Sequence, residues 1–268
     1  MDWFWLLNYL ALGAVTGVFA GLLGVGGGGI MVPLLSMMFA AQGFSPEHNV
    51  HLALGTSMAA IVPTAIASAY AHHRRGGVVW PAVRGLAPGV LLGTFAATFV
   101  ASFLSGVPLA IFFAVFMSAV ALYMIIDKPP RPDRVLPGAI GLGAVGTGIG
   151  GVSALVAIGG GSLTVPFLVW CNVSMARAVG TSAAVGLPIA AAGAAGYMVN
   201  GWGVLGLPEH TLGFVVWPAV LAMALMSFIT APIGARLAHR LPVVTLKRIF
   251  AVVMVLLAVK MLHGVLLG

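Results

Sequence analysis

Residues 26–33 read GGGGIMVP inside a long apolar run, and residues 159–166 read GGGSLTVP in a similar setting. Each glycine in a helix interior costs about 1 kcal/mol relative to alanine and gives the backbone access to non-helical conformations. We therefore predict that a membrane helix is broken at both places. Because lipid cannot satisfy free N–H and C=O groups, each break must be buried in protein or line a wet cavity.

The composition indicates a membrane protein. Of the 268 residues, 61% are hydrophobic and only 6% are charged, and the mean hydropathy is +1.13. These values exclude an ordinary soluble domain and predict an all-α, multi-pass protein in a lipid bilayer. The Lys and Arg residues lie in short loops, so they report orientation rather than a nucleic-acid surface. The single cysteine, Cys171, excludes an internal disulfide and a thiolate metal cluster.

The apolar runs predict about ten hydrophobic segments in one transmembrane domain, 1–268. Repeat one (1–126) has five runs and repeat two (136–268) has five more, joined by the charged linker 127–135. The runs lie at about 4–24, 30–41, 52–71, 85–104, 108–126, 136–157, 162–171, 177–198, 213–235 and 246–267. The second run of each repeat is shorter than the roughly 20 residues that a straight spanning helix needs. The sequence leaves open whether these two runs cross fully or re-enter.

An odd number of segments in each half predicts inverted repeats, because the second copy then enters the membrane from the opposite side. The internal similarity is direct: residues 26–35 align with 159–168 at a shift of 133, and residues 53–63 align with 178–188 at a shift of 125. The loop charges agree with ten crossings. Arg-rich loops around residues 74–84 and 128–134 fall on the cytoplasmic side when both termini are outside.

Each repeat also carries the tripeptide GTS, and we predict that the two tripeptides and the two glycine breaks form one binding site. Free N–H groups at glycine turns and helix N-termini form anion sites, and Thr and Ser hydroxyls add neutral donors. The alternative interpretation is that small residues merely allow helices to pack closely. Repetition of both clusters favours a binding role. The candidate residues are Gly26, Gly27, Gly28, Pro33, Gly55, Thr56, Ser57, Gly159, Gly160, Gly161, Pro166, Gly180, Thr181 and Ser182.

The acidic residues are as informative as the glycines. All five, Asp2, Glu47, Asp127, Asp133 and Glu209, fall in tails or loops of the predicted arrangement. A carboxylate proton relay or cation site inside the membrane is therefore not expected, and a pathway with dipolar donors alone suits an anion.

Arg177 is a further candidate, because it precedes Gly180 by three residues and could draw an anion inward. Its alternative role is a cytoplasmic anchor at the membrane surface. The sequence has none of the common enzyme motifs. We expect no enzyme, no cofactor and no metal site, and a small anionic substrate as the partner.

These motifs resemble the TauE/SafE family, also called the sulfite exporter or toluene sulfonate uptake permease family. The stretches GLLGVGGGGIMVP, ALGTS, AIGGGSLTVP and AVGTS occur in the family's order and in its two-repeat layout. The resemblance implies a multi-pass transporter of the bacterial-type inner membrane that moves sulfur-containing anions such as sulfite, sulfoacetate or related organosulfonates. One departure is that Gly29 of the first repeat corresponds to Ser162 of the second.

Together these observations predict an alternating-access permease. An anion that leaves a negative interior gains about 2.3 kcal/mol per charge per 100 mV, which favours export without a coupled ion. Two alternatives remain: a passive anion channel, and an uptake permease coupled to protons. Uptake would depend on histidines that the apolar runs place in loops.

Overall fold

A computed structural model describes residues 2–23, 27–126, 133–238 and 243–267, and these ranges contain ten helices. The all-α, multi-pass prediction is confirmed, since eight of the helices are long and apolar enough to span a bilayer. The helices are α1 (Trp3–Leu23), α2 (Gly28–Ala41), α3 (Pro46–Arg74), α4 (Trp80–Phe103), α5 (Gly106–Ile126), α6 (Ala139–Val156), α7 (Gly161–Trp170), α8 (Met175–Asn200), α9 (Trp217–Ala238) and α10 (Val243–Leu267).

One element was not predicted. A two-stranded antiparallel hairpin, β1 (Thr211–Leu212) and β2 (Val215–Val216), precedes α9. Its turn contains Gly213, whose φ of 56° is accessible to glycine without strain. The ninth apolar run therefore begins in extended backbone, and the helix starts only at Trp217.

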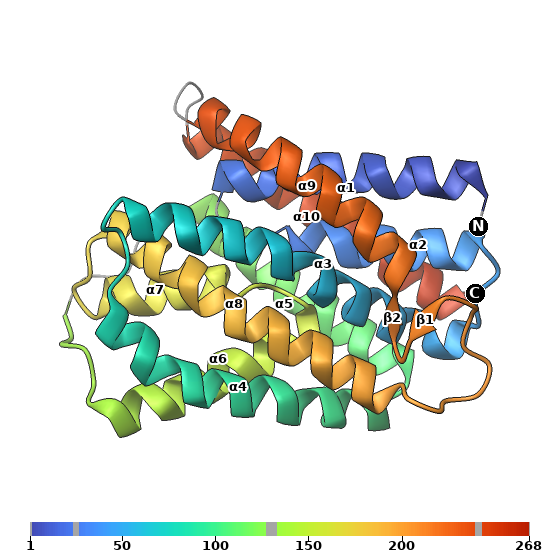
Figure 1. Cartoon of the computed structure of the whole chain (residues 1–268), viewed down its shortest axis with the longest axis horizontal. Helices are drawn as coiled ribbons and strands as arrows, with labels where there is room; N and C mark the ends of the chain where they lie inside the picture. The colour runs from blue at the N-terminus through green and yellow to red at the C-terminus, as the bar shows by residue number, and fades with distance from the viewer. Residues whose placement is uncertain (1, 24–26, 127–132, 239–242, 268) are drawn as a thin grey trace.

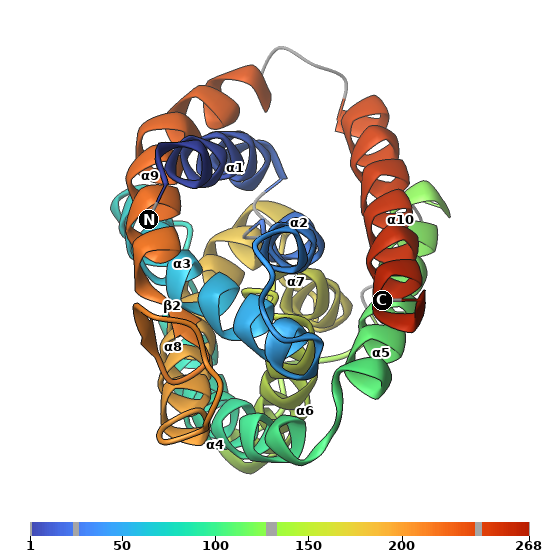
Figure 2. The same cartoon turned by 90° about the vertical axis from the view of Figure 1, so that its right-hand side faces the viewer.

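The two repeats, α1–α5 and α6–α10, are interlocked rather than side by side. Helices α3 and α8 pack against each other, and they are the most buried of the eight long apolar helices. Helix α4 of the first repeat packs on α6 and α8 of the second, and α9 of the second packs on α1 and α3 of the first. Figure 2 shows α2 and α7 near the middle, with long helices around them.

The repeats have opposite directions in the bundle. Figure 1 shows α3 and α8 running toward opposite ends, and it places both chain termini at the same end. Helices α2 and α7 start near the middle and run to opposite ends (Figure 1). With 14 and 10 residues, they are about 21 and 15 Å long, against a bilayer core of about 30 Å. Each is a half-helix that does not cross the membrane by itself.

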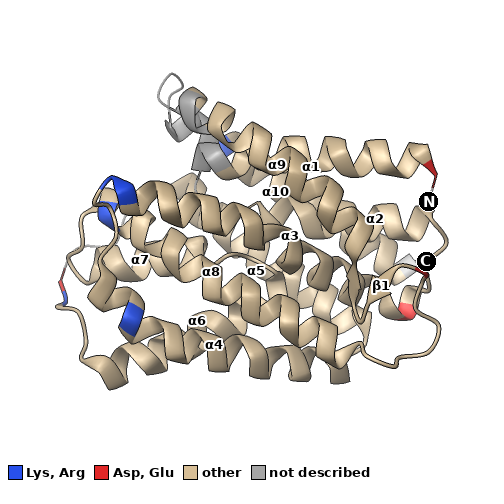
Figure 3. Cartoon of the chain, viewed as in Figure 1, with Lys and Arg blue, Asp and Glu red and all other residues tan. Residues whose placement is uncertain are grey.

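Charge is separated between the two ends of the bundle. Figure 3 shows most of the visible Lys and Arg at the end opposite the termini, and most of the acidic residues at the termini's end. Helix α3 illustrates this, with Glu47 in its first turn and His72, His73 and Arg74 in its last. Of the predicted linker, 127–132 lies outside the described residues; beyond it, the Arg134 guanidinium stacks on the ring of Trp170 at 5.5 Å.

Candidate functional site

The predicted helix breaks are present in both repeats. Helix α1 ends at Leu23 and α2 begins at Gly28, while α6 ends at Val156 and α7 begins at Gly161. The residues just before the two half-helices, Gly27 and Gly160, have φ/ψ of 71°/−10° and 78°/−10°. This left-handed conformation strains any residue with a Cβ, which explains the glycines at these two positions. Gly26, the first residue of the predicted site, lies outside the described residues.

The two breaks contact each other through their backbones. Gly28 packs against the carbonyl oxygen of Ala157, so closely that a Cβ on Gly28 would overlap it. Ile61 of α3 covers both breaks: Cβ atoms built on Gly28 and Gly159 would lie 3.3 and 3.5 Å from its side chain. Gly186 of α8 packs against the carbonyl oxygen of Gly159 from the other side. The breaks of repeats one and two therefore meet between the two central helices.

Each break presents the N-terminus of a half-helix. The first N–H groups of an α-helix have no acceptor within it, and here they belong to Gly28 and Gly29 in α2 and to Gly161 and Ser162 in α7. These groups carry the positive end of the helix dipole. Pro33 lies four residues after Gly29, and Pro166 lies four residues after Ser162. Because proline has no N–H, the carbonyls of Gly29 and Ser162 also lack the helical donor that they would otherwise have.

The glycine of each GTS tripeptide allows a close backbone contact with the other repeat. Gly55 of α3 packs on the carbonyl oxygen of Phe214, in the turn before β2. Gly180 of α8 packs on the carbonyl oxygen of Gly77, in the α3–α4 connection. A methyl group at either position would overlap that oxygen, so no larger residue fits without a backbone shift.

The threonine of each tripeptide makes a hydrogen bond close to the backbone contact of its glycine. The N–H of Val216 donates to Oγ1 of Thr56 over 3.0 Å, and the N–H of Val79 donates to Oγ1 of Thr181 over 2.9 Å. Val79 directly precedes α4 and Val216 directly precedes α9, so each bond holds the start of one repeat's fourth helix to the other repeat's third. We call these two bonds the cross-repeat clasps.

The partners of the clasps were not predicted, although the sequence contains a signal for them. Residues 78–83 and 215–220 both read VVWPAV, an identical hexapeptide at the start of α4 and α9. This hexapeptide lies outside the glycine and GTS motifs. Its repetition indicates that the fourth helices of the two repeats begin in the same local structure.

The serines of the two tripeptides, unlike the threonines, take no part in the cross-repeat clasps. Ser57 and Ser182 are fully or almost fully buried, and within the described part of the chain their hydroxyls have no hydrogen-bond partner. Each lies one helical turn before a residue that touches the second break, Ser57 before Ile61 and Ser182 before Gly186. The serines, rather than the threonines, therefore carry the GTS hydroxyls that no group in the described chain engages.

Arg177 is placed apart from this buried cluster. Its side chain is exposed at the start of α8, and its carbonyl accepts a hydrogen bond of 2.6 Å from the Thr181 hydroxyl. The structure thus uses the backbone of Arg177 to orient a clasp residue. A role of its guanidinium in attracting an anion stays a prediction.

The expectation that the histidines lie in loops is wrong for α3. This helix begins at Pro46, six residues before the predicted apolar run, and it includes His48, His51, His72 and His73. His51 is 4% exposed; its Nε2 lies 2.9 Å from the carbonyl oxygen of Ala101, and its ring packs on Phe214. Protein contacts bury this polar start of the helix and pair one polar atom each of Asn49 and His51, so it needs no apolar sequence.

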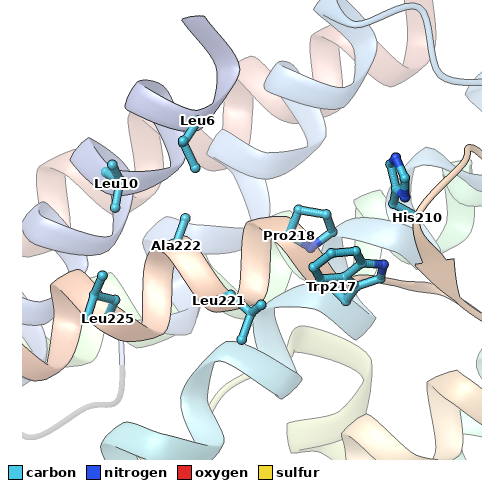
Figure 4. Close-up of a pocket in the computed structure, with 8 residues that line it drawn as sticks. All are labelled: Leu6, Leu10, His210, Trp217, Pro218, Leu221, Ala222 and Leu225. Carbon is cyan, nitrogen blue, oxygen red and sulfur yellow. The ribbon is translucent and has the colours of Figure 1, made fainter. Parts of the chain in front are cut away.

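A groove of about 480 Å³ lies between α1 and α9 and does not match the chemistry of the breaks (Figure 4). It is lined by Leu6, Leu10, His210, Trp217, Pro218, Leu221, Ala222 and Leu225. Leu221 and Leu225 are more than half exposed, as expected of side chains that face lipid tails. The groove offers almost no hydrogen-bond donors and does not suit an anion.

Inverted repeats, half-helices that meet near the middle of the bundle, and free helix N-termini at that point are features of secondary membrane transporters. The comparisons with known proteins agree. The family described as "Sulfite exporter TauE/SafE" matches residues 9–261, and the chain belongs to this family of membrane transporters.

Similar curated proteins support this assignment. A "Probable membrane transporter protein" of Haemophilus influenzae is 36% identical over 263 residues, covering 96% of this chain and 97% of its own. A protein of the same description from Xylella fastidiosa is 28% identical and covers 95% and 94% of the two chains. The "Probable membrane transporter protein YdhB" of Bacillus subtilis is 24% identical, covering 87% and 90%. No solved structure matches the chain significantly.

Proposed function

We propose that this protein is an alternating-access permease of the inner membrane that exports a small sulfur-containing oxyanion. The observation that carries the proposal is the pair of half-helix N-termini between α3 and α8. One turn before the residues of α3 and α8 that touch the breaks lie Ser57 and Ser182, whose hydroxyls have no hydrogen-bond partner in the described chain. Backbone N–H groups and hydroxyls are the donors that oxyanions bind. The four acidic residues in the described part of the chain, Asp2, Glu47, Asp133 and Glu209, are exposed, so none of them lies among these buried donors. The family description supports a sulfur oxyanion as the substrate.

The orientation follows from the charge at the two ends. If the basic end with Arg74 faces the cytoplasm, as the positive-inside rule requires, both termini lie outside. In this orientation α2 extends from the breaks toward the outside and α7 toward the cytoplasm. Ile61 covers both breaks, so it must move away before an anion reaches the donors. Rocking of the two repeats about the breaks then exposes the site alternately to each side.

Flux in proteoliposomes tests the proposal. Labelled sulfite and sulfoacetate are loaded on one side with an imposed membrane potential, and the native chain is compared with Ser57→Ala and Ser182→Ala. Saturable flux that increases when the destination side is positive, and that falls at least about tenfold in both variants, is expected. Ser102→Ala is the matched control, since its exposed hydroxyl only donates to the carbonyl of Phe99. If the native chain transports no sulfur oxyanion, the proposed class of substrate is wrong.

The same assay separates the carrier from a passive channel. A carrier shows counterflow, in which unlabelled substrate on one side drives accumulation of labelled substrate against its gradient. A channel with the same donors shows no counterflow, and its flux does not saturate at low substrate concentration.

His51 favours a second candidate, uptake coupled to protons. Its Nδ1 is buried and has no hydrogen-bond partner in the described chain, so a proton placed there needs an acceptor that water or a bound anion supplies. The ionisable neighbours on its own helix are Glu47 and His48; from α4 it meets the Ala101 carbonyl, and from the segment before β2 the Phe214 ring. Substrate-driven acidification of the vesicle lumen that is lost in His51→Asn would support uptake. Electrogenic flux that His51→Asn leaves intact would support export without a proton.

A further inference from the structure

The hydroxyl groups at the two glycine breaks are not equivalent. Ser153, Ser162 and Thr164 of repeat two lie in the last turn of α6 and the first turn of α7. At the shift of 133, the corresponding residues of repeat one are Ala20, Gly29 and Met31. The second break therefore has three hydroxyls at positions where the first break has none.

The three hydroxyls of the second break are buried and unused. Thr164 and Ser153 are at most 1% exposed, and in the described part of the chain the hydroxyl oxygens of all three have no hydrogen-bond partner. Thr164 Oγ1 lies 3.4 Å from the Cβ position of Gly160, the residue that caps α7. It is thus next to the N-terminus of α7, where Gly161 and Ser162 present free N–H groups.

The GTS serines lie one helical turn before residues that contact the breaks. Ser182 precedes Gly186, which contacts Gly159 of the second break, and Ser57 precedes Ile61, whose side chain contacts both breaks. Since a buried polar group without a partner costs free energy, several such hydroxyls around one helix N-terminus indicate a site that a ligand completes. The helix dipole at this end favours a negative charge.

At the first break the hydroxyl residue beside Gly27 is Thr16, but its hydroxyl already donates to the carbonyls of Leu12 and Gly13 in α1. Gly29 has polarisable neighbours. Gly29 lies between two methionines: its Cβ position is 2.9 Å from Sδ of Met254 and 3.3 Å from Sδ of Met117. These thioethers come from α10 and α5, which pack against each other. Gly28, the preceding residue, touches Ala157 of the second break. The methionines around the first break therefore adjoin the second break, which carries the hydroxyls. Thioethers are weak acceptors and provide no donor for an oxyanion.

We propose that Ser162 and Thr164 form a one-sided oxyanion subsite at the N-terminus of α7, and that Met117 and Met254 receive the less polar end of the same ligand. This inference rests on the proposed function and makes it more specific. The preferred ligand has one sulfonate head and a short apolar substituent. A second charge at the far end, as in sulfoacetate, weakens binding because the thioethers cannot solvate it.

Ligand-induced stabilisation of the purified full-length protein tests the subsite without transport. Ethanesulfonate, sulfite and sulfoacetate are titrated in detergent, and the melting temperature is followed. Ethanesulfonate should bind most tightly. Ser162→Ala and Thr164→Val should each raise its half-saturating concentration about tenfold or more, as expected for the loss of a hydrogen bond to a charged group.

Conservative and matched variants exclude a general folding effect. Thr164→Ser keeps the hydroxyl and should retain most of the affinity. Ser102→Ala and Thr147→Val remove exposed hydroxyls of the same types on α4 and α6 and should change nothing. Unchanged ethanesulfonate binding in both Ser162→Ala and Thr164→Val would overturn the subsite. It would also be overturned if none of the three anions raised the melting temperature. Tighter binding of sulfite or sulfoacetate than of ethanesulfonate would overturn the role of Met117 and Met254.

Flux measured on the same proteins separates this inference from the proposed function. Binding that depends on Ser162 and Thr164, without flux of any of the anions, supports the subsite and contradicts the permease. Flux that neither substitution alters supports the permease and contradicts the subsite.

Discussion

The hydroxyl of Thr56 accepts a hydrogen bond from the backbone N–H of Val216, 160 residues further along the chain, over 3.0 Å. The equivalent bond of the other repeat joins Thr181 to Val79 over 2.9 Å. Both threonines are completely buried. The GTS tripeptide therefore divides its tasks: the glycine permits the contact, the threonine makes the bond, and the serine remains available to a ligand.

Replacing Thr56 by valine should destabilise the protein with little direct effect on ligand affinity. Valine has nearly the same shape but no acceptor, so the buried N–H of Val216 loses its partner at a cost of about 1–3 kcal/mol. Thr56→Ser should keep most of the stability. The melting temperature in detergent measures the change, and Thr147→Val on the exposed face of α6 is the control. A loss of affinity at full stability would instead place Thr56 in the binding site.

Alanine at Gly55 or Gly180 should lower stability by about 1–3 kcal/mol, because the added methyl group meets the carbonyl oxygen of Phe214 or Gly77. Gly148→Ala is the matched control, since a Cβ at this helical position of α6 meets nothing within 4 Å. That substitution should be neutral or stabilising, as alanine favours the helix. Equal melting temperatures for Gly55→Ala and Gly148→Ala would contradict the close contact.

Alanine at Gly27 or Gly160 should cost about 1–2 kcal/mol through backbone strain, because both residues have positive φ. Asparagine, which tolerates the left-handed region better, should be less harmful than alanine in a comparison of melting temperatures. At Gly160 any side chain also meets Ile189. Gly27→Asn should therefore be milder than Gly160→Asn, and the opposite order would argue against this account of the two caps.

Cysteine labelling can test the orientation. In a Cys171→Ser background, which has no other cysteine, Glu209→Cys and Asp133→Cys place single thiols at exposed positions beyond the two ends of the bundle. A membrane-impermeant maleimide applied to intact spheroplasts should label position 209 and spare position 133 until the cells are lysed. The reverse result would invert the predicted topology and the direction in which α2 and α7 extend.

Much of the fold could be predicted from hydrophobicity alone. The ten apolar runs match the ten helices of the described residues closely, since lipid imposes a strong and local constraint on each segment. The main error was the start of α3. Its first turns contain Asn49 and His51, which are buried against protein and bonded to the carbonyls of Ser36 and Ala101. Hydropathy does not register that tertiary contacts bury polar side chains and pair at least one polar atom of each.

The candidate site could be located from the repeated motifs, but the roles within it could not be assigned. Thr56 and Ser57 are neighbours with similar side chains, and only the position of Val216 shows that one hydroxyl is engaged and the other is not. The difference between Ser162 and Gly29 was visible in the sequence. Its meaning depends on Met117 and Met254, which lie on other helices and come close only in the folded chain.

The length of chain between Thr56 and Val216 has a consequence for biogenesis. At a synthesis rate of roughly 5–20 residues per second, the ribosome needs on the order of 10–30 s to make the 160 residues that separate them. During this interval α3 is already made, while its GTS segment lacks the backbone that will cover it. The nascent first half therefore lacks its bond to Val216 until α9 emerges. Substitutions in the hexapeptide at 215–220 should then reduce the amount of protein that accumulates in the cell more than they affect the protein that has matured.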